Sequence, residues 1–472
     1  MDAEDTEARD AVVDCTEGTD ARPNQLERRH VQLTVAQRRA VWAAAIGNAV
    51  EFYDWAVYGT FVAIFSPLFF VADDDVTSLL AGLAVFAVGF VARPVGAVVL
   101  GSYADRVGRK RTLIIAVTIT SFAALVMAVL PSYESIGVLA PITLITARLA
   151  QGFAAGGEAS GSMTYLAEMA PAGRRGFIGS FQQVSSAAGI LAASLMGTLL
   201  TNTLPPAALT AWGWRIAFVV AFLLGLVGFV LRRAADETDA FVRVEDRAGQ
   251  QKRHSAVEAL QRNPKQMLQV FGLGIPATTI NYLWLTYMPT LAHTMGGIPL
   301  GQAMVANTIA LALTCCILPL CGAFSDRFGR KTNLYIFTLG FVACSYPAVA
   351  LLGVSLPMLV VVQLIGAVLL AFDGAIIASQ YNELFPTETR AAGTAIPYAL
   401  SVAMFGGTAP YVVTWLATTG RAHWIGVYVG LVALVGFLTT LTLPETSRRS
   451  LEGEHEDTKS PASPHPRKDV ST

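Results

Sequence analysis

The sequence predicts an all-α membrane protein of twelve transmembrane helices, arranged in two six-helix bundles with both termini in the cytoplasm. The chain of 472 residues is 53% hydrophobic and 14% charged, and its mean hydropathy is +0.51. Soluble domains carry about 25% charged residues, so this composition is typical of a polytopic membrane protein. Repeated apolar stretches and a motif that occurs once in each half complete the prediction.

A membrane crossing needs about 20 apolar residues, and six such stretches lie on each side of one long polar interruption. In the first half we expect spans at 42–68, 78–101, 111–130, 137–167, 177–202 and 214–232. In the second half we expect them at 267–292, 301–324, 333–352, 356–384, 392–418 and 423–443. The interruption therefore predicts a boundary between two bundles.

The domain boundaries follow from this pattern and from two polar tails, whose acidic, serine and proline residues are typical of disorder. The predicted parts are a disordered cytoplasmic N-tail (1–40), an N-terminal bundle (41–232), a cytoplasmic linker (233–264), a C-terminal bundle (265–443) and a disordered cytoplasmic C-tail (444–472). The first twenty residues lack the basic and apolar regions of a signal peptide, so we expect no cleaved leader.

The distribution of basic residues predicts the orientation, because lysine and arginine near span ends are retained in the cytoplasm. One face of the expected topology has only Arg215 and Arg421. The other face gathers basic residues at 38–39, 106–111, 174–175, 232–265, 327–331, 390 and 448–449. We therefore expect a multi-pass protein of the plasma (inner) membrane with both termini inside.

Composition also excludes several function classes. A net charge of −1 argues against a nucleic-acid partner, which would call for a basic face. The five cysteines show no metal-ligand spacing and are interpreted as small core residues, so we expect no metal and no cofactor. The sequence has neither a P-loop nor the spacing of a nucleophile and base, which argues against ATP-driven transport and against an enzyme.

An internal repeat supports the two halves. GSYADRVGRK at 101–110 returns as GAFSDRFGRK at 322–331, with six of ten residues identical, and each copy lies between the second and third span of its half. Duplicated bundles are the arrangement of carriers that bind their substrate between the repeats.

Over roughly 41–445, the chain resembles the major facilitator superfamily and, within it, the metabolite:proton symporters that carry α-ketoglutarate, citrate, shikimate, or proline and betaine. The motifs behind the resemblance are GNAVEFYDWAVYG (47–59), ARPVGAVVLGSYADRVGRK (92–110), LITARLAQGFAAGGE (144–158), WGWRIAF (212–218), LRRAADETDAF (231–241) and GAFSDRFGRK. The resemblance implies a two-bundle carrier that rocks around a central site and takes up small carboxylates or zwitterions with protons.

The repeated motif also predicts a cytoplasmic gate, since an acid at a helix end followed by basic residues can latch one bundle to the other. The resemblance implies the same role; the alternative is that the basic residues only retain the loop inside. The gate residues are Gly101, Asp105, Arg106, Gly108, Arg109, Asp326, Arg327, Gly329 and Arg330.

Two acids lie within the first span. On a helical wheel Gly47, Glu51, Asp54 and Tyr58 fall within about 60°, which predicts one polar stripe facing away from lipid. Glu51 should lie roughly 14 Å into the bilayer, where an exposed carboxylate costs at least about 2.5–3.5 kcal/mol. We therefore expect this helix to line a wet passage between the bundles.

Arg148, in the fourth span, is expected at the depth of Glu51, with Gln151 on its helical face and Glu158 deeper. Burial favours a protonated carboxyl and a nearby arginine favours a carboxylate, so an acid between these effects can bind and release a proton. The candidates for proton coupling are Glu51, Asp54, Arg148 and Glu158. The alternative is a fixed polar network that only holds helices together.

Guanidinium groups in mid-membrane favour a carboxylate substrate, because each can donate two parallel hydrogen bonds to it. The alternative for Arg93, beside Pro94, is a packing contact with an acid of the first span. The candidates for substrate binding are Arg93, Arg148, Tyr58, Gln151, Asn281, Tyr282, Asn307, Asp373 and Gln380; the second-half residues can equally hold helices together.

The expected function is proton-coupled symport of a small carboxylate, such as a dicarboxylate or tricarboxylate, by alternating access. The alternative is proton-coupled uptake of an osmolyte or zwitterion such as proline or betaine; a drug or metabolite exporter is less favoured. A channel or solute sensor would fit the helices but not the repeated motifs. The expected partners are the substrate, protons and the lipid bilayer, and a monomer is expected to suffice.

Overall fold

The computed structural model describes residues 35–72, 74–169, 173–234, 261–386 and 389–447. The description leaves out the side chains at 35–44, 105–106, 109–110, 158–169, 231–232, 234 and 391–392. The chain divides into two units between Val41 and Trp42. Every contact given below lies within the second unit.

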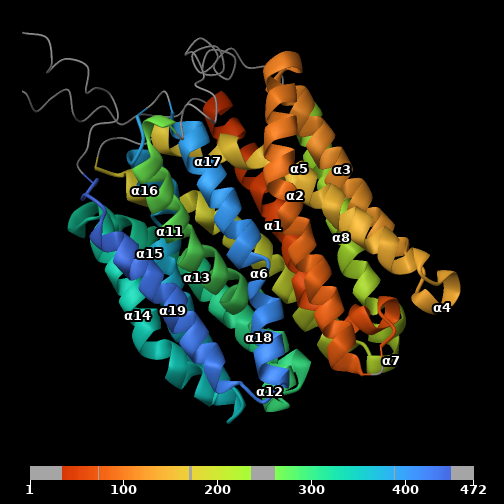
Figure 1. Ribbon diagram of the computed structural model, residues 1–472. Coiled ribbons are helices and arrows are strands. Elements are labelled where there is room, and N and C mark those ends of the chain that lie inside the picture. The colour runs from red at the N-terminus through yellow and green to blue at the C-terminus, as the bar shows by residue number, and fades with distance from the viewer. Residues whose placement is uncertain (1–34, 73, 170–172, 235–260, 387–388, 448–472) are drawn as a thin grey trace, which may run out of the picture. The chain divides into compact units, whose positions relative to one another are not determined.

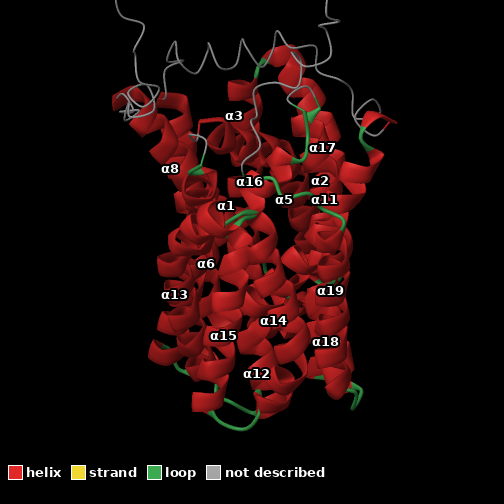
Figure 2. Ribbon diagram, turned by 90° about the vertical axis from the view of Figure 1, so that its left-hand side faces the viewer, coloured by secondary structure: helices red, strands yellow, loops and turns green. Residues whose placement is uncertain are grey.

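The described elements are all helical (Figures 1 and 2). In the first half they are α1 (Val35–Phe69), α2 (Asp75–Val107), α3 (Arg109–Val129), α4 (Tyr133–Ile136), α5 (Leu139–Met169), α6 (Arg175–Thr203), α7 (Pro206–Ala208), the π-helix η1 (Leu209–Gly213) and α8 (Trp214–Ala234). In the second half they are α11 (Pro264–Asn281), the π-helix η2 (Tyr282–Tyr287), α12 (Met288–Gly296), α13 (Leu300–Phe328), α14 (Arg330–Leu351), α15 (Leu356–Gly374), α16 (Ile377–Glu383), α17 (Arg390–Ser401), the π-helix η3 (Val402–Gly406), α18 (Ala409–Thr418) and α19 (His423–Leu441).

These elements make the twelve predicted crossings. Nine helices in the described ranges are long and apolar enough to span a membrane on length and composition alone. The crossings by α1, by α5 and by α11, η2 and α12 bring the number to twelve. The twelve-helix fold is thus confirmed. The predicted linker falls mostly on residues outside the described ranges, as do most of both tails, and α1 begins at Val35, inside the range predicted as a tail.

The halves meet along a few helix pairs. Within each half, α2 packs on α5 and α3 on α8, and α14 packs on α19 and α13 on α15. Between the halves, α6 packs along α13, while α2 contacts η3 and α18, and α5 contacts α16 and α17. The first-half colours and the second-half colours of Figure 1 show these two groups of helices side by side. The expected central site would lie among these helices.

The repeated motif folds the same way twice. Gly108 ends α2 and begins α3 with φ 96° and ψ 148°, and Gly329 joins α13 to α14 with φ 98° and ψ 158°. A positive φ of this kind is accessible mainly to glycine. The predicted repeat is therefore a repeat of structure.

Besides η1, which precedes α8, the π-helical segments η2 and η3 interrupt two further crossings, and such segments are frequent at functional sites. The segment η3 (Val402–Gly406) lies in the crossing expected at 392–418, and η2 (Tyr282–Tyr287) lies in the crossing expected at 267–292. Because η3 contacts α2 and η2 contacts α6, both irregular segments lie where the halves meet.

Candidate functional site

The indole ring of Trp55 on α1 is the centre of a cluster of cations and aromatic rings. The Cζ atom of Arg93, on α2, lies 4.1 Å from the centroid of this ring, and that of Arg148, on α5, lies 4.4 Å from it. Tyr58 adds a second ring 4.2 Å from Arg148 Cζ. Arg148 is 0% exposed. Cation–π contacts of this kind stabilise a guanidinium that has left water.

Gln151 links Arg148 to the acid of α1. Arg148 Nη1 donates to Gln151 Oε1 at 2.9 Å, and Gln151 Nε2 donates to Asp54 Oδ2 at 2.6 Å. The sequence predicted that Arg148 would face the acids of the first span. Within the described residues the connection to Asp54 runs through the amide, so the predicted neighbours are brought together indirectly.

Two nitrogen atoms of Arg148 are not satisfied by the described residues. Nε and Nη2 are buried and have no hydrogen-bond partner among the described residues. Most buried polar atoms in proteins have a partner, so such atoms need an explanation. Nε–H and Nη2–H form one edge of the guanidinium, the edge that donates two parallel hydrogen bonds to a carboxylate.

Aromatic and acidic groups join this cluster to the second half. The ring of Tyr282 in η2 lies 5.0 Å from that of Phe90 on α2, and its hydroxyl interacts with Arg93. Glu51 interacts electrostatically with Tyr282 and with Tyr398 of α17. These interactions connect Glu51 and Arg93 of the first half with two tyrosines of the second half.

The second half contributes amide and hydroxyl groups. Gln380 of α16 is 1% exposed, and neither amide atom has a partner in the described part of the chain. The amide of Gln363 on α15 and the hydroxyl of Tyr381 are also buried and have no hydrogen-bond partner among the described residues. Asp373, near the end of α15, is 3% exposed and interacts electrostatically with Tyr398. The predicted residues Gln380 and Asp373 are therefore buried polar groups near the same boundary.

Three other candidates have contacts that suit structural roles. Tyr58 is fully buried, and its hydroxyl donates to the carbonyl of Gly82 at 3.0 Å. Asn307 of α13 donates from Nδ2 to Ser194 Oγ, on α6, and to a carbonyl of η2. Asn281, half-buried, ends α11 where η2 begins. The side chain of Glu158 lies outside the described residues.

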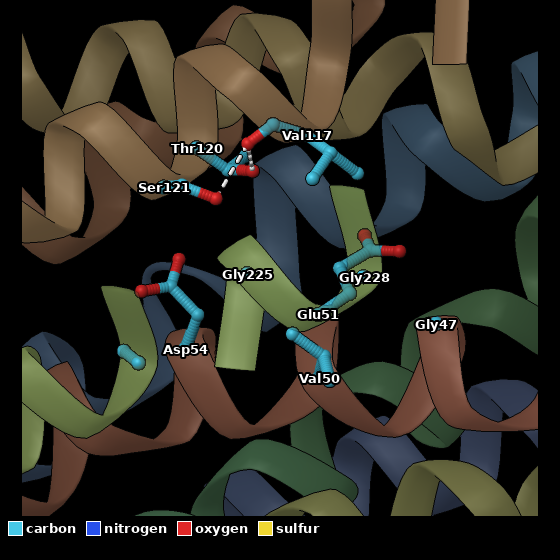
Figure 3. Close-up of a pocket in the computed structure, with 10 residues that line it drawn as sticks. Gly47, Val50, Glu51, Asp54, Val117, Thr120, Ser121, Gly225 and Gly228 are labelled. Atoms are coloured by element: carbon cyan, nitrogen blue, oxygen red, sulfur yellow. Dashed lines mark hydrogen bonds between the residues drawn. The ribbon is translucent and has the colours of Figure 1, made fainter. Parts of the chain in front are cut away.

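A small pocket opens beside the acids of α1, inside the first half (Figure 3). It is lined by α1, α3 and α8, and has room for about one or two water molecules. Its lining residues are Gly47, Val50, Glu51, Asp54, Val117, Thr120, Ser121, Ala221, Gly225 and Gly228. The sequence predicted instead a passage between the bundles. The polar stripe is broad enough for Asp54 to face α3 and α8 while Glu51 also reaches the second half.

The glycines of α5 allow this helix to pack closely against α2. A Cβ at Gly152 would collide with the carbonyl of Gly89, and one at Gly156 with the carbonyl of Arg93, both on α2. The close helix pair is thus α2 and α5, because the glycines face α2.

At the cytoplasmic end, one predicted gate residue joins the two halves. Asp326 of α13 accepts hydrogen bonds from the backbone N–H groups of Gly176 (2.8 Å) and Phe177 (2.9 Å), in the first turn of α6. An acid at a helix N-terminus is favoured by the exposed N–H groups and by the helix dipole. This is the kind of contact that the latch prediction described.

Arg330, at the start of α14, forms an ion pair with Asp326 within the second half. It is 0% exposed, and its Nη1 lies 2.8 Å from Asp326 Oδ1. Its Nε and Nη2 donate to the two oxygens of Glu383 at 3.3 and 3.1 Å. The exposed Arg327 lies over the ring of Phe328 instead. Gly101 has open space around its α-carbon, and the side chains of Asp105, Arg106 and Arg109 lie outside the described part.

Sequence reasoning did not single out several residues of this cluster. Trp55 lies inside a motif that was quoted, yet it was not proposed as a cation partner. Phe86, Phe90 and Arg93 recur at helical spacing on α2, a signal that could have predicted an aromatic face for a guanidinium. Gln363 gave no signal apart from its polarity within an apolar span.

Comparison with known proteins identifies the family. The family model "Sugar (and other) transporter" matches residues 40–271, and the model "Major Facilitator Superfamily" matches residues 296–471. The chain is 38% identical to the alpha-ketoglutarate permease of Escherichia coli, over 86% of this chain and 94% of that one. It is 34% identical to the citrate-proton symporter of Klebsiella pneumoniae, over 88% and 93% of the two chains.

Other relatives act on zwitterions, and the solved structures support the fold. The proline/betaine transporter of Escherichia coli is 33% identical, over 88% of this chain and 85% of that one. The xylose transporter XylE from E. coli, in a partially occluded inward open conformation, matches with a TM-score of 0.67 at 20% identity, over 88% and 99% of the two chains. With two family models covering most of its length and relatives matched nearly end to end, this multi-pass membrane protein belongs to the major facilitator superfamily, among its metabolite:proton symporters.

Proposed function

We propose that the chain is a proton-coupled symporter of a small carboxylate-bearing metabolite, working by alternating access in the plasma membrane as a monomer. The substrate carboxylate binds at Arg148, with Arg93 beside it, and Asp54 carries the coupled proton. The names of the α-ketoglutarate and citrate relatives support the substrate class. The geometry of the Trp55 cluster supports the assignment of roles.

The observation that carries the proposal is the free edge of Arg148. A fully buried guanidinium with two adjacent N–H groups that have no partner in the described part of the chain should bind a planar anion strongly. Its other edge is engaged by Gln151, and its faces lie against Trp55 and Tyr58. A carboxylate is the group whose two oxygens match the free edge.

Charge balance explains why a proton accompanies the substrate. Two guanidinium groups, Arg93 and Arg148, and two carboxylates, Glu51 and Asp54, lie in the cluster, and their charges cancel when all four are ionised. Each carboxylate group that arrives adds one negative charge in a region that water does not reach freely, which is unfavourable without a partner. Protonation of Asp54 offsets one of these charges, and Gln151 connects that event to Arg148.

The gate and the irregular helices supply the movement. With the site facing outward, the contact of Asp326 with the N-terminus of α6 holds the cytoplasmic ends of the halves together. The π-helical segments η2 and η3 lie at the boundary of the halves, where a change of helical register can alter the site. Opening of the latch then exposes the site to the cytoplasm.

Uptake of a zwitterion such as proline or betaine is the second candidate. The relatives of 33–34% identity that act on such compounds favour it, and the carboxylate of a zwitterion would fit the same edge of Arg148. A quaternary ammonium group needs free aromatic faces. Two guanidinium groups already lie against Trp55, and this contact favours a purely anionic substrate.

Reconstituted liposomes can test the proposal. The purified chain is expected to accumulate labelled α-ketoglutarate or citrate against a gradient when the outside is acid, and an uncoupler should abolish the accumulation. Counterflow should persist with the uncoupler present. Accumulation of labelled proline or betaine alone would favour the second candidate. Non-saturable flux, or uphill uptake that ignores the uncoupler, would contradict proton symport.

A further inference from the structure

The pocket between α1, α3 and α8 offers oxygen atoms and no N–H group from the side chains of its described lining residues. Ser121 Oγ–H donates to the carbonyl of Val117 at 2.7 Å, and Thr120 Oγ1–H donates to the same carbonyl at 3.0 Å. A hydroxyl has a single hydrogen. Both hydroxyls therefore present only lone pairs to anything bound in the pocket.

The two carboxylate oxygens of Asp54 have different surroundings. Oδ2 accepts from Gln151, toward Arg148, whereas Oδ1 has no hydrogen-bond partner among the described residues. The residue is 7% exposed and lines the pocket, and Figure 3 shows its carboxyl extending from α1 toward Ser121. A buried carboxylate oxygen that faces two hydroxyl oxygens is a place for a cation or for a proton donor.

The pocket extends from Asp54 toward the cytoplasm, away from the centre of the bilayer. The helix α1 enters from the cytoplasm. Gly47 precedes Asp54 by seven residues on this helix, so the two residues are about 10 Å apart along its axis. Gly228 lies nearer the cytoplasmic end of α8 than Ala221, and Val117 lies nearer that end of α3 than Ser121. All three helices thus place the far end of the pocket on the cytoplasmic side.

The charged and titratable groups around Asp54 are few. Glu51 lines the same pocket on α1, Arg148 interacts with Asp54 from α5, and the phenol of Tyr53 interacts with it on α1 while donating to the carbonyl of Ala217 on α8. The lining residues described on α3 and α8 are all uncharged. Two carboxylates therefore line the pocket, and Arg148 is connected through Gln151 to the oxygen Oδ2 of Asp54.

We propose that this pocket binds a small monovalent cation, hydronium or Na⁺, against Asp54 Oδ1, Ser121 and Thr120, at a site separate from that of the substrate. A hydronium ion would transfer its proton to Oδ1 and leave a water molecule, whereas Na⁺ would be held by the oxygen atoms directly. Either event changes the net charge at Asp54, and Gln151 connects Asp54 to Arg148 through two hydrogen bonds. The proposal that a cation binds depends only on the pocket. The role of this cation in coupling rests on the proposed symport.

The first arm of the test uses substrate-free protein and Na⁺. Melting temperature is measured in NaCl, LiCl, KCl and choline chloride at constant ionic strength and pH. If Na⁺ is the ligand, Na⁺ or Li⁺ should raise the melting temperature by about 2 °C or more relative to choline. Ser121→Ala should raise the Na⁺ concentration for half of this effect about tenfold. Thr118→Ala removes an exposed hydroxyl of α3 that is bonded in the same way, and should match the wild type.

The second arm measures protons. If hydronium is the ligand, Na⁺ should have no effect, and the pH of half-maximal proton uptake by the substrate-free protein should shift by about half a unit or more in Ser121→Ala and Thr120→Val. Thr118→Ala should again match the wild type. The proposal is overturned if Ser121→Ala and Thr120→Val behave as Thr118→Ala in both arms.

A steric pair checks that the pocket itself is responsible. A Cβ at Gly225 would collide with Ser121 Oγ, whereas a Cβ at Gly228 meets nothing within 4 Å. Gly225→Ala should abolish the cation effect, and Gly228→Ala should change it less. If Gly225→Ala does not fold, the hydroxyl variants decide. Since these arms contain no substrate, failure of the symport assay would leave the cation site standing, and a Na⁺ response would support the site while contradicting a proton as the coupling ion.

Discussion

The two halves of the molecule repeat the same turn and the same helix order, but their mid-membrane chemistry differs. The first half brings together two guanidinium groups, two carboxylates and a set of aromatic rings around Trp55. The second half presents the buried amides of Gln363 and Gln380 and the acid Asp373. We infer from this difference that the first half binds the substrate carboxylate and the proton, and that the second half determines which substrate is bound.

The largest expected effect is that of Arg148→Lys. A lysine keeps the positive charge but has no planar edge for a carboxylate. Each hydrogen bond to a charged group contributes about 1.5–3 kcal/mol, and 1.4 kcal/mol is a factor of ten, so kcat/KM for counterflow should fall about 100-fold or more. Arg215→Lys, which alters an arginine at an outer helix end that donates to two backbone carbonyls, is the control. Counterflow at the wild-type rate in Arg148→Lys would remove anion recognition from the first half.

Asp54→Asn should separate coupling from transport. The amide cannot take up and release a proton in the working pH range, so uphill accumulation should be lost, while counterflow, which needs no net proton movement, should stay within about threefold of the wild type. Glu51→Gln should reduce accumulation less, because Gln151 contacts Asp54. Both variants are compared with Asp373→Asn in the same vesicles. If only Asp373→Asn abolishes accumulation, the coupled proton is carried by the second half and not by the first.

Gln380→Leu tests the contribution of the second half. An amide with both polar atoms unsatisfied in the described structure can donate to the substrate, and one such bond to a charged group corresponds to about a tenfold change in KM. We expect KM to rise about tenfold and the uncoupler-sensitive accumulation to persist. Gln302→Leu, on the exposed side of α13, should leave KM unchanged. Equal KM values for the two variants would place Gln380 outside the site.

The sequence allowed the crossings, the orientation and the repeated turn to be predicted, because these depend on apolar length, charge near span ends and glycine at a positive φ. It also placed Glu51, Asp54 and Arg148 at similar depth. Depth follows from the rise per residue along a helix, and this quantity does not depend on the neighbouring helices.

The rotation of each helix could not be predicted in the same way. A polar stripe of about 60° on a wheel does not decide whether Asp54 faces the second half or α3 and α8. That choice depends on which helices approach closely. The close approach of Ser121 on α3 to Gly225 on α8, and the pocket that both residues line together with Asp54, decide it. Such contacts join residues that are far apart in the sequence, and no local pattern reports them.

Asp326→Asn should weaken the latch moderately. Asparagine keeps one acceptor for the N–H groups of α6 but loses the charge that suits a helix N-terminus and Arg330, a change of about 1 kcal/mol. Cross-linking between cysteines introduced by Phe177→Cys and Ala323→Cys, in a chain without its native cysteines, should slow about fivefold. Asp105→Asn, in the first-half copy of the motif, is the matched variant. An unchanged rate in Asp326→Asn would mean that the ion pair does not hold the gate.

The smallest expected effect concerns two carboxylates that cap helices at the membrane surface, one in each half. Partial burial tends to raise the pKa of Glu445, but the backbone N–H groups of Arg330, Ser447 and Lys331 donate to its carboxylate and outweigh burial, so its pKa lies below the usual 4.5. Donation from the backbone N–H of Thr77 lowers the pKa of Asp74 in the same direction, at the start of α2.

A carboxyl whose pKa is lowered by folding stabilises the folded state above its unfolded pKa, and this contribution is lost as the pH falls through the folded pKa. Glu445→Gln should therefore lower the melting temperature at pH 7 by about 1–2 °C, and the difference from the wild type should shrink below about pH 4.5. Glu445 joins the end of α19 to α14, whereas Asp74 caps its own helix, so Asp74→Asn should have the smaller effect. Melting temperatures of both variants at pH 7, 5 and 4 check this order. A difference in Glu445→Gln that grows as the pH falls would contradict the lowered pKa.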